Sequence, residues 1–476
     1  MHHRRPAAPH SHRPNHRQIN RLMPFTTAPL FHALQLLETG DSARFHMPGH
    51  KGEPVFNTYA DIFAIDFTET YGTGNLYTGE GPIRDAEVAA ARYFGSEDCF
   101  FLTGGSTQGI LAMLGTAVGR DGAVLLDREV HKSVCYGCAL LGITPYFFSA
   151  PLIEPFAVSG ALPVKDAEAQ LIAHPEIKAI LLTSPTYYGI RRAIPEFADL
   201  CRAHGKLLLV DGAHGAHFPA VGLPTPVAEG ADMAVLSMHK TLPCMGQGAV
   251  LLSAAGVDRR ALRENTMLFG TSSPSYPIMA SIDLARAYTE GPGHAEYRRS
   301  AETCAELRAY VQHRTMFTAL TEDHFPALTR AARRCTAGTN TGRRWPIRCG
   351  ANAAWRDGGR PHVFILTGSD PNGAISRLKR GLRRISRRRE LIPLPSLSAP
   401  FPPAERVMSV RDAWFSQTGR VQPAAAEGLV CARPVTPYPP GVPLLWPGEK
   451  ITGAHIALIR ERWYNTIDEI TVVVHQ

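Results

Sequence analysis

From about Cys99 to Leu252, short apolar segments rich in β-branched and aromatic residues alternate with segments of helical periodicity. Helices are predicted at Ile110–Val118, Asp166–Ala173 and Pro195–Ala203. Nearly continuous apolar strands that alternate with helices are typical of a mainly parallel sheet covered on both faces, so this pattern restricts the chain to an α/β fold. The seven predicted strands are Cys99–Thr103, Ala123–Asp127, Thr144–Ser149, Ala179–Thr183, Leu207–Asp211, Met233–Ser237 and Gly248–Leu252.

Ligands of such sheets bind beyond the carboxyl ends of the strands, so the residues that follow the predicted strands are candidates for function. The first strand leads into Thr103-Gly-Gly-Ser-Thr-Gln-Gly109 and then into a helical segment. The glycines permit a tight turn, and Ser106 and Thr107 then stand at the helix start, where free backbone N–H groups favour an anion. An ordinary helix cap explains the same residues. Because no lysine follows the glycines, this is not a Walker loop.

Three other strand ends carry polar side chains that one ligand would explain together. His131 follows the second strand, Asp211 ends the fifth, and Lys240 follows the apolar run that ends at Ser237. Taken singly, each has an ordinary explanation as a surface histidine, a turn-capping carboxylate or a solvated lysine. Pyridoxal phosphate (PLP) would satisfy all of them, because it carries a phosphate, a flat ring with a protonated nitrogen and an aldehyde that a lysine attacks. The sequence therefore predicts a PLP site at this edge of the sheet.

The charge distribution argues against a nucleic-acid partner, although the whole chain carries a formal net charge of +8. Between Asp41 and Glu290 there are 18 basic and 26 acidic residues, a net charge of −8, so the remaining residues carry +16. The excess lies in the N-terminal tail and in two Arg-rich stretches, 330–360 and 377–389, outside the predicted sheet. A basic groove is therefore not expected on the α/β region.

Cysteine usage and hydropathy indicate a protein of a reducing compartment without a membrane partner. The nine cysteines are odd in number and lack the spacing of a disulfide scaffold, so we expect a cytoplasmic location. Cys135 and Cys138 form a CxxC pair on a segment, 133–141, that is predicted to be helical. No second ligand pair for zinc accompanies them, and no metal site is expected. No apolar run reaches the roughly 18 residues that a membrane helix needs.

Several long motifs resemble those of the Orn/Lys/Arg decarboxylases, PLP-dependent enzymes of fold type I, in the short form that lacks an N-terminal wing domain. The likeness is strong over residues 25–310 and looser over 361–476. The matching segments are "RFHMPGHKG" (44–52), "DFTETYGTGNLYTGEGPIRDAE" (66–87), "TGGSTQG" (103–109), "DREVHKS" (127–133), "LTSPTYYGI" (182–190), "VDGAHGAH" (210–217), "SMHKTLP" (237–243), "FGTSSPSYPIMASID" (269–283) and "VTPYPPGVPLLWPGE" (435–449).

The resemblance implies a role for each of the strand-end residues. Lys240 would bind PLP, Asp211 would pair with its ring nitrogen, and His131 would stack on the ring and help to move protons. His214 would hydrogen-bond the phenolic oxygen of the ring, and Glu449, in the "PGE" element, would help to shape the amino-acid site. The phosphate would be held by Ser106, Thr107, Ser237 and His239, with Thr271 and Ser272 reaching it from a neighbouring subunit.

The implied domain organisation places the cofactor site in the longest unit. We expect a disordered basic tail (1–24), an N-terminal segment (25–60), a large PLP-binding domain (61–310), an irregular Arg-rich segment (311–360) and a small C-terminal α/β domain (361–476). Residues 314–360 hold nine arginines and three acidic residues without a sustained period, which suggests a local disruption of the reading frame. Further expected elements are a helix at Tyr297–Gln312, a strand at Val363–Thr367, a helix at Asn372–Ile385 and an ordered loop at Val430–Ile451.

The resemblance implies decarboxylation of arginine, lysine or ornithine to the corresponding di- or polyamine. The expected assembly is a homodimer or a higher homo-oligomer with shared active sites. An aminotransferase or lyase of the same fold stays open, because the protein groups that hold PLP serve many reactions. A catalytically impaired PLP-binding relative stays open as well, because the Arg-rich segment departs from the family pattern.

Overall fold

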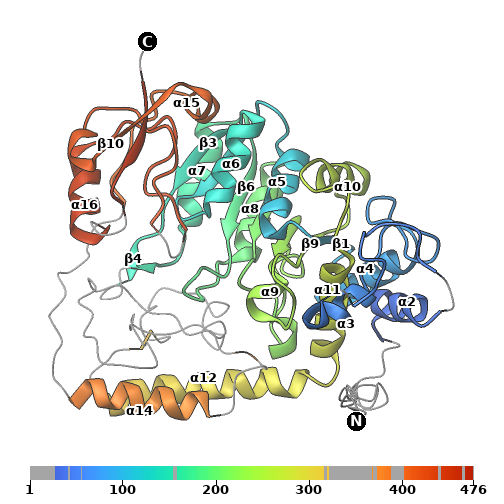
Figure 1. Ribbon diagram of the computed structural model, residues 1–476. Coiled ribbons are helices and arrows are strands. Elements are labelled where there is room, and N and C mark those ends of the chain that lie inside the picture. Colours follow the sequence, from blue (N-terminus) through green and yellow to red (C-terminus); the bar gives the residue numbers. More distant parts are fainter. Residues whose placement is uncertain are drawn as a thin grey trace, which may run out of the picture.

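A seven-stranded sheet in the order β1-β9-β8-β7-β6-β2-β3 forms the centre of the protein (Figure 1). The computed structural model describes residues 27–40, 43–54, 56–153, 158–315, 319–320, 367, 373–387, 401–437, 441–463 and 467–474. The strands of the sheet are β1 (Asp98–Leu102), β2 (Ala123–Asp127), β3 (Thr144–Phe148), β6 (Ile177–Thr183), β7 (Leu207–Asp211), β8 (Met233–Leu236) and β9 (Ala249–Ser253). The sheet is parallel from β3 to β8, and β9 is antiparallel to both of its neighbours.

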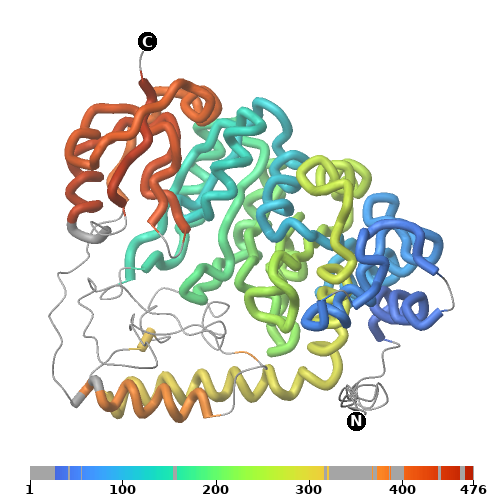
Figure 2. Tube along the Cα trace, viewed as in Figure 1, coloured from blue at the N-terminus to red at the C-terminus, as the bar shows by residue number. Residues whose placement is uncertain are grey.

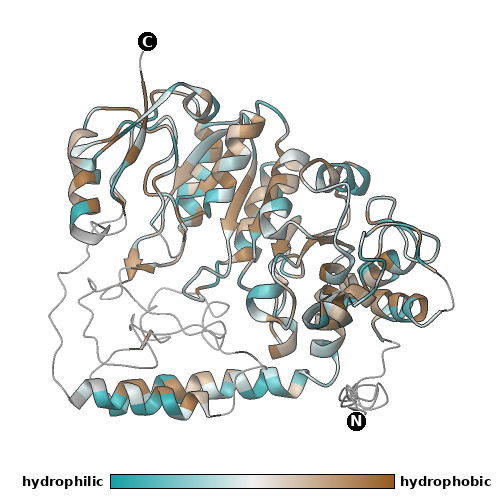
Figure 3. Ribbon diagram, in the orientation of Figure 1, coloured by the Kyte–Doolittle hydropathy of each residue, from teal (hydrophilic) through white to brown (hydrophobic). Residues whose placement is uncertain are grey.

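Both faces of this sheet are buried, and each strand contributes to both hydrophobic cores. Side chains alternate between the two faces along a strand. Phe101 therefore belongs to one core while its neighbours Phe100 and Leu102 belong to the other. Figure 3 shows that hydrophobic residues dominate the central strands. Burial on both faces explains why the strands are continuous apolar runs in the sequence.

Helices cover the two faces of the sheet. The first core receives side chains from α4 (Gly81–Phe94), α7 (Val164–Ala173), α8 (Ile194–Ala203) and α11 (Tyr276–Glu290). The second core receives side chains from α5 (Gly105–Ala117), α6 (Lys132–Leu141), α10 (Arg259–Leu268) and α15 (Val410–Phe415). The predicted α/β fold with helices on both faces is therefore confirmed.

The predicted elements agree with the observed ones to within a few residues. Helix α5 begins at Gly105, five residues before the predicted start, because the turn residues already belong to the helix. The antiparallel direction of β9 was not predicted, since a buried strand has the same apolar pattern in either direction. Cys135 and Cys138 lie on α6 as expected and are buried free cysteines.

The C-terminal region forms a smaller unit beside β3 and α6 (Figure 2). Strands β10 (Thr418–Val421) and β11 (Ile470–Val473) pair antiparallel, and helix α16 (Gly453–Trp463) lies beside them. Arg411 joins this unit to the large one, because it forms an ion pair with Asp121 and donates to the carbonyl of Leu140. The expected loop at 430–451 is held by isolated bridges between Val430 and Lys450 and between Val435 and Leu445.

Two helices connect these units. Helix α12 (His294–Arg314) matches the helix predicted at 297–312, and α14 (Ala374–Arg387) matches the one predicted at 372–385. They lie side by side, and Leu307 packs with Leu382 (Figure 1). The remaining elements are α2 (Pro29–Glu38), α3 (Ala60–Ala64), α9 (Met238–Thr241), β4 (Leu152–Ile153), β5 (Val158–Ser159) and the 3-10 turns at Asn57–Tyr59, Pro219–Val221 and Pro423–Ala425.

Several expectations fall outside the described residues. These are the tail at 1–24, nearly all of the strand at 363–367 and most of the Arg-rich segment at 311–360. Within the described part of the chain, no helix combines the length and the apolar character that crossing a membrane requires.

Candidate active site

A pocket with an empty volume of ≈ 540 Å³ opens at the carboxyl ends of the central strands. Five of the predicted site residues line it, each following a different strand or turn: Ser106, His131, Asp211, His214 and Lys240. The parallel sheet thus brings together side chains that are as far as 134 positions apart in the sequence.

Asp211 and Lys240 reach the pocket from neighbouring strands. Asp211 ends β7 and stands in register with Val235 of β8, and α9, which carries Lys240, follows β8 directly. Asp211 is buried, and its Oδ1 accepts a hydrogen bond from the backbone N–H of Ala213 at 3.1 Å. Burial lowers the pKa of Lys240, and the negative charge of Asp211 opposes that effect. A lysine with a lowered pKa has a larger neutral fraction, which is the nucleophilic form.

His214 lies beside Lys240, with its Nε2 3.4 Å from Nζ of the lysine. Burial lowers the pKa of His214 to about 3, and the positive charge of Lys240 adds to the effect, so the ring is neutral. Nε2 of a neutral ring accepts a hydrogen bond from the lysine, which leaves the proton on Nδ1. Nδ1 of His214 is buried and has no hydrogen-bond partner among the described residues. His214, a residue that lines the pocket, therefore carries a buried Nδ1–H donor that no described residue satisfies.

The tautomer of His131 is fixed by its place at the start of α6. It is the N-cap residue, and its Nδ1 accepts a hydrogen bond from the backbone N–H of Ser133 at 3.2 Å. A neutral ring that accepts at Nδ1 carries its proton on Nε2. Burial lowers the pKa of His131, with the charge of Asp211 raising it and that of Lys240 lowering it. His131 is thus a neutral imidazole with Nε2–H as its donor.

The turn between β1 and α5 places the start of a helix at the pocket that Lys240 also lines. Gly105 has φ +73°, a conformation that glycine adopts without strain, and Gly109 brings α5 directly against Val235 of β8. Ser106 follows in the first helical turn, and its Oγ accepts a hydrogen bond from Ser237 Oγ at 3.1 Å. The free N–H groups and the dipole of this 13-residue helix favour a negatively charged ligand there.

Five predicted phosphate ligands are not among the residues that line the pocket. Ser237 reaches it through Ser106, and His239 is tied by its backbone and its Nδ1 to the carbonyl of Gly248 at the start of β9. Thr107 lies in the first turn of α5 beside Ser106. Thr271 and Ser272 are exposed on this chain, on a loop that Tyr77 holds through the carbonyl of Thr271.

Glu449 is buried away from the pocket lining. Its Oε2 accepts hydrogen bonds from Arg128 Nη2 at 3.0 Å and from the backbone N–H of Trp446 at 2.7 Å. Burial raises the pKa of Glu449, and the Arg128 charge lowers it. In this chain Glu449 therefore contributes to the ion pair that attaches residues 444–449 to the end of β2.

Several lining residues were not predicted from the sequence. Glu129 stands two positions before His131, but a functional role was predicted only for the histidine of this loop. The segment after β6 belongs to the motif at 182–190. No role was predicted for its side chains, although this segment too follows a buried strand. These additional lining residues are Glu129, Thr183, Thr186, Tyr187, Tyr188, Ala213 and Val442.

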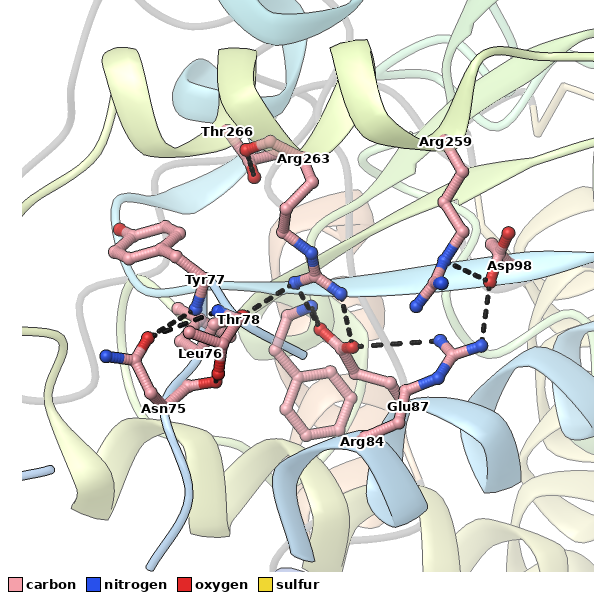
Figure 4. Close-up of polar contacts among 11 residues, drawn as sticks. Asn75, Leu76, Tyr77, Thr78, Arg84, Glu87, Asp98, Arg259, Arg263 and Thr266 are labelled. Atoms are coloured by element: carbon pink, nitrogen blue, oxygen red, sulfur yellow. Dashed lines mark hydrogen bonds and ion pairs between the residues drawn. The ribbon is translucent and has the colours of Figure 1, made fainter. Parts of the chain in front are cut away.

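An ion-pair network links α4 to α10, and Figure 4 shows the residues that form it. Glu87 of α4 is fully buried and binds Arg263 of α10 through two hydrogen bonds of 2.9 and 2.6 Å. Gln108 of α5 donates to the carbonyl of Thr266 on α10 and accepts from the backbone N–H of Gly104. The network thereby fixes α10 against α4 and, through Gln108, against the turn that precedes Ser106.

The pocket residues suit PLP better than a metal ion. No group of three or more metal-ligating side chains occurs in the part of the chain that the structure describes. By contrast, the helix start beside Ser106, the buried carboxylate of Asp211 and the free Nδ1–H of His214 offer partners for a phosphate, a ring nitrogen and a phenolic oxygen. Lys240 lies among them with a lowered pKa.

Comparison with known families decides the relationship. The model of the Orn/Lys/Arg decarboxylase major domain matches residues 28–348, and that of the C-terminal domain of the same enzymes matches residues 402–462. The chain belongs to the Orn/Lys/Arg decarboxylase family. The resemblance predicted from the sequence motifs is therefore confirmed.

Comparison with individual proteins covers most of the chain in two cases and about half of it in a third. An arginine decarboxylase of Halalkalibacterium halodurans is 27% identical over 91% of this chain and 93% of its own length. The uncharacterized protein YaaO of Bacillus subtilis is 37% identical, but the match covers 55% of this chain and 56% of that protein. Lysine decarboxylase A from Pseudomonas aeruginosa shares the fold at a TM-score of 0.76 and 20% identity, covering 96% of this chain and 82% of that one. The fold is that of the fold-type-I PLP-dependent decarboxylases.

Proposed function

We propose that this protein decarboxylates a basic amino acid (arginine, lysine or ornithine) with PLP as its cofactor, and releases the corresponding amine. The observation that carries the proposal is the placement of Lys240 beside Asp211 and His214, next to the N-terminus of α5. Family membership selects decarboxylation from the reactions that such a site supports. When bound, PLP supplies an electron sink for the bond that breaks at Cα.

Each side chain has a defined task in this proposal. Lys240 attaches the cofactor, and its lowered pKa supplies the neutral amine that this requires. Asp211 keeps the ring nitrogen protonated, while His214 donates from Nδ1 to the phenolic oxygen. His131 stacks on the ring and, with Nε2–H, is a candidate donor for the proton that Cα takes up. The phosphate is assigned to Ser106, Thr107, Ser237 and His239.

We further propose that the enzyme is a homodimer or a higher homo-oligomer. The exposure of Thr271 and Ser272 supports this, because these residues are available to reach the phosphate of a second subunit. A cytoplasmic location is supported by the free cysteines among the described residues. We retain 25–60, 61–310 and 361–476 as the proposed N-terminal, large and small units, and Glu449 as a residue that helps to shape the amino-acid site.

Replacing Lys240 by alanine tests the function directly. K240A should lose both CO2 release from the accepted amino acid and the visible absorbance of lysine-bound PLP, because Lys240 is the only lysine among the described residues that line the pocket. The control is K165A, which removes an exposed lysine of α7 and should keep both properties. CO2 release by K240A at the wild-type rate would refute the role of Lys240. If the wild-type enzyme converted the amino acid to a keto acid, the protein would be an aminotransferase.

A further inference from the structure

At the end of β2, two carboxylates lie near one buried guanidinium, which forms an ion pair with one of them. Asp127 forms an ion pair with Arg192 at 2.9 Å, and both side chains are essentially inaccessible to water. Arg192 also donates to the carbonyl of Gly160 and to Ser159 Oγ. Glu129 follows Asp127 closely, and its backbone N–H donates to Asp127 Oδ1 at 3.0 Å. The two Nη groups of Arg192 are thus bound to Asp127, Gly160 and Ser159, whereas its buried Nε has no hydrogen-bond partner among the described residues.

Glu129 has no ion pair of its own in the described part of the chain. Burial raises the pKa of Glu129 to about 7, and the negative charge of Asp127 adds to this effect. Arg192 and a hydrogen bond from Ser159 lower it, but not enough to restore the ordinary value. The wall of the pocket therefore has one more negative charge than its own cations balance, and a positively charged group would be favoured beside Glu129.

The other carboxylates near the pocket do not carry an unbalanced negative charge. Asp211 faces Lys240, whose pKa it influences, and Glu449 is bound to Arg128 and does not line the pocket. Glu129 does line it. Among these three carboxylates, Glu129 is thus the one that lines the pocket without a described ion pair and without a lysine facing it.

The rest of the lining suits an aliphatic chain that ends in a cation. Tyr187 contacts His214 edge-on, with ring centroids 5.7 Å apart, and Tyr188 contacts Tyr187 in the same way at 5.4 Å. These rings extend the apolar lining from the cofactor residues, and Val442 adds to it from the C-terminal unit. Methylene groups pack well against such surfaces, whereas a charged end group needs a carboxylate.

We propose that Glu129 binds the distal ammonium or guanidinium group of the amino-acid substrate, while Tyr187, Tyr188 and Val442 pack against its methylene groups. This inference rests on the proposed function and deepens it, because it names the residue that selects a basic side chain. Glu129 then acts on substrate binding more than on the chemical step.

Steady-state CO2 release by the holoenzyme tests the assignment. E129Q keeps the shape of the side chain and removes its charge, so KM for the basic amino acid that the wild type accepts should rise roughly ten- to a hundredfold. The KM values for citrulline and norleucine, which are uncharged counterparts of arginine and lysine, should change less than about threefold. The matched control E168Q removes an exposed carboxylate of α7 and should leave both constants unchanged. An unchanged KM for the basic substrate, or equal losses with charged and uncharged substrates, would overturn the proposal.

A binding measurement separates this inference from the proposed function. Calorimetric titration with 1,5-diaminopentane and with pentylamine should show that the wild type prefers the diamine and that E129Q loses this preference. If the wild type releases no CO2 but shows this pattern, the decarboxylase proposal fails and the cation site stands. If the wild type is active and E129Q binds both amines as the wild type does, the proposed cation site is wrong while the decarboxylase proposal stands. Should E129Q not fold, E129D applies the same comparison with a displaced carboxylate.

Discussion

Two clusters of charged side chains flank the central sheet, and they differ in how their charges are balanced. Around Glu87, every carboxylate has at least one guanidinium: Glu87 binds Arg263, and Asp98 binds Arg84 and Arg259 (Figure 4). At the end of β2, Asp127 binds Arg192 while the neighbouring Glu129 has no described ion pair. The balanced cluster joins helices to a strand, whereas the unbalanced one lines a pocket. An uncompensated buried charge is costly, so its presence in a pocket wall is best explained by a ligand that supplies the missing charge.

The largest expected effect comes from unbalancing the first cluster. E87Q removes the charge that compensates Arg263, whose side chain is only 11% exposed, and should lower the free energy of unfolding by about 3–5 kcal/mol. Urea denaturation of the wild type and the variant measures this difference. E264Q on the same helix is the control, because Glu264 and its partner Arg260 are exposed and such pairs contribute only about 0.3–0.5 kcal/mol. If E87Q lowered the free energy of unfolding as little as E264Q does, the contrast between the cluster around Glu87 and the cluster at the end of β2 would be removed.

A smaller effect is expected in the pH dependence of substrate binding. Because the pKa of Glu129 is raised to about 7, the side chain is mainly neutral at pH 6 and mainly anionic at pH 8. KM for a basic substrate should therefore fall by about tenfold as the pH rises from 6 to 8. Initial rates across this range measure it, with norleucine as the uncharged reference. The other titratable or charged groups of this region are Asp127, Arg192, His131, Asp211, His214 and Lys240.

These other groups are unchanged in E129Q, so the difference between the two pH profiles reports Glu129 itself. The variant should show a nearly flat KM over the same range. Identical profiles for the wild type and E129Q would assign the titration to another group of the pocket and break the proposed contrast.

The smallest effect is expected on stability at the second cluster. A carboxyl group whose pKa is higher in the folded than in the unfolded state favours folding while it is protonated, and this contribution is lost as the pH rises through about 7. At pH 8, E129Q should therefore be as stable as the wild type or more stable by roughly 1 kcal/mol, opposite in sign to E87Q. Thermal unfolding of both variants at pH 6 and pH 8 measures this. A loss of several kcal/mol in E129Q would show that Glu129 is a structural ion like Glu87.

Much of the fold and part of the site followed from local sequence patterns. The seven strands and four of the covering helices, α5 to α8, were predicted because their apolar residues recur with the period of a buried strand or of a helix. Asp211, His131 and Lys240 were found because each follows such a strand, and the structure places all three around one pocket. The direction of β9 could not be predicted, since both directions bury the same residues.

The sequence by itself determined the kinds of chemical group at the ends of the strands, because strand and helix periods are local properties of a few consecutive residues. Only the tertiary structure decided which charges neutralise one another. Arg128 reaches Glu449 across 321 positions and Arg192 reaches Asp127 across 65, and these pairings leave Glu129 facing the pocket. The physical reason is that electrostatic energy depends on distance and burial in space, and neither can be derived from spacing along the chain.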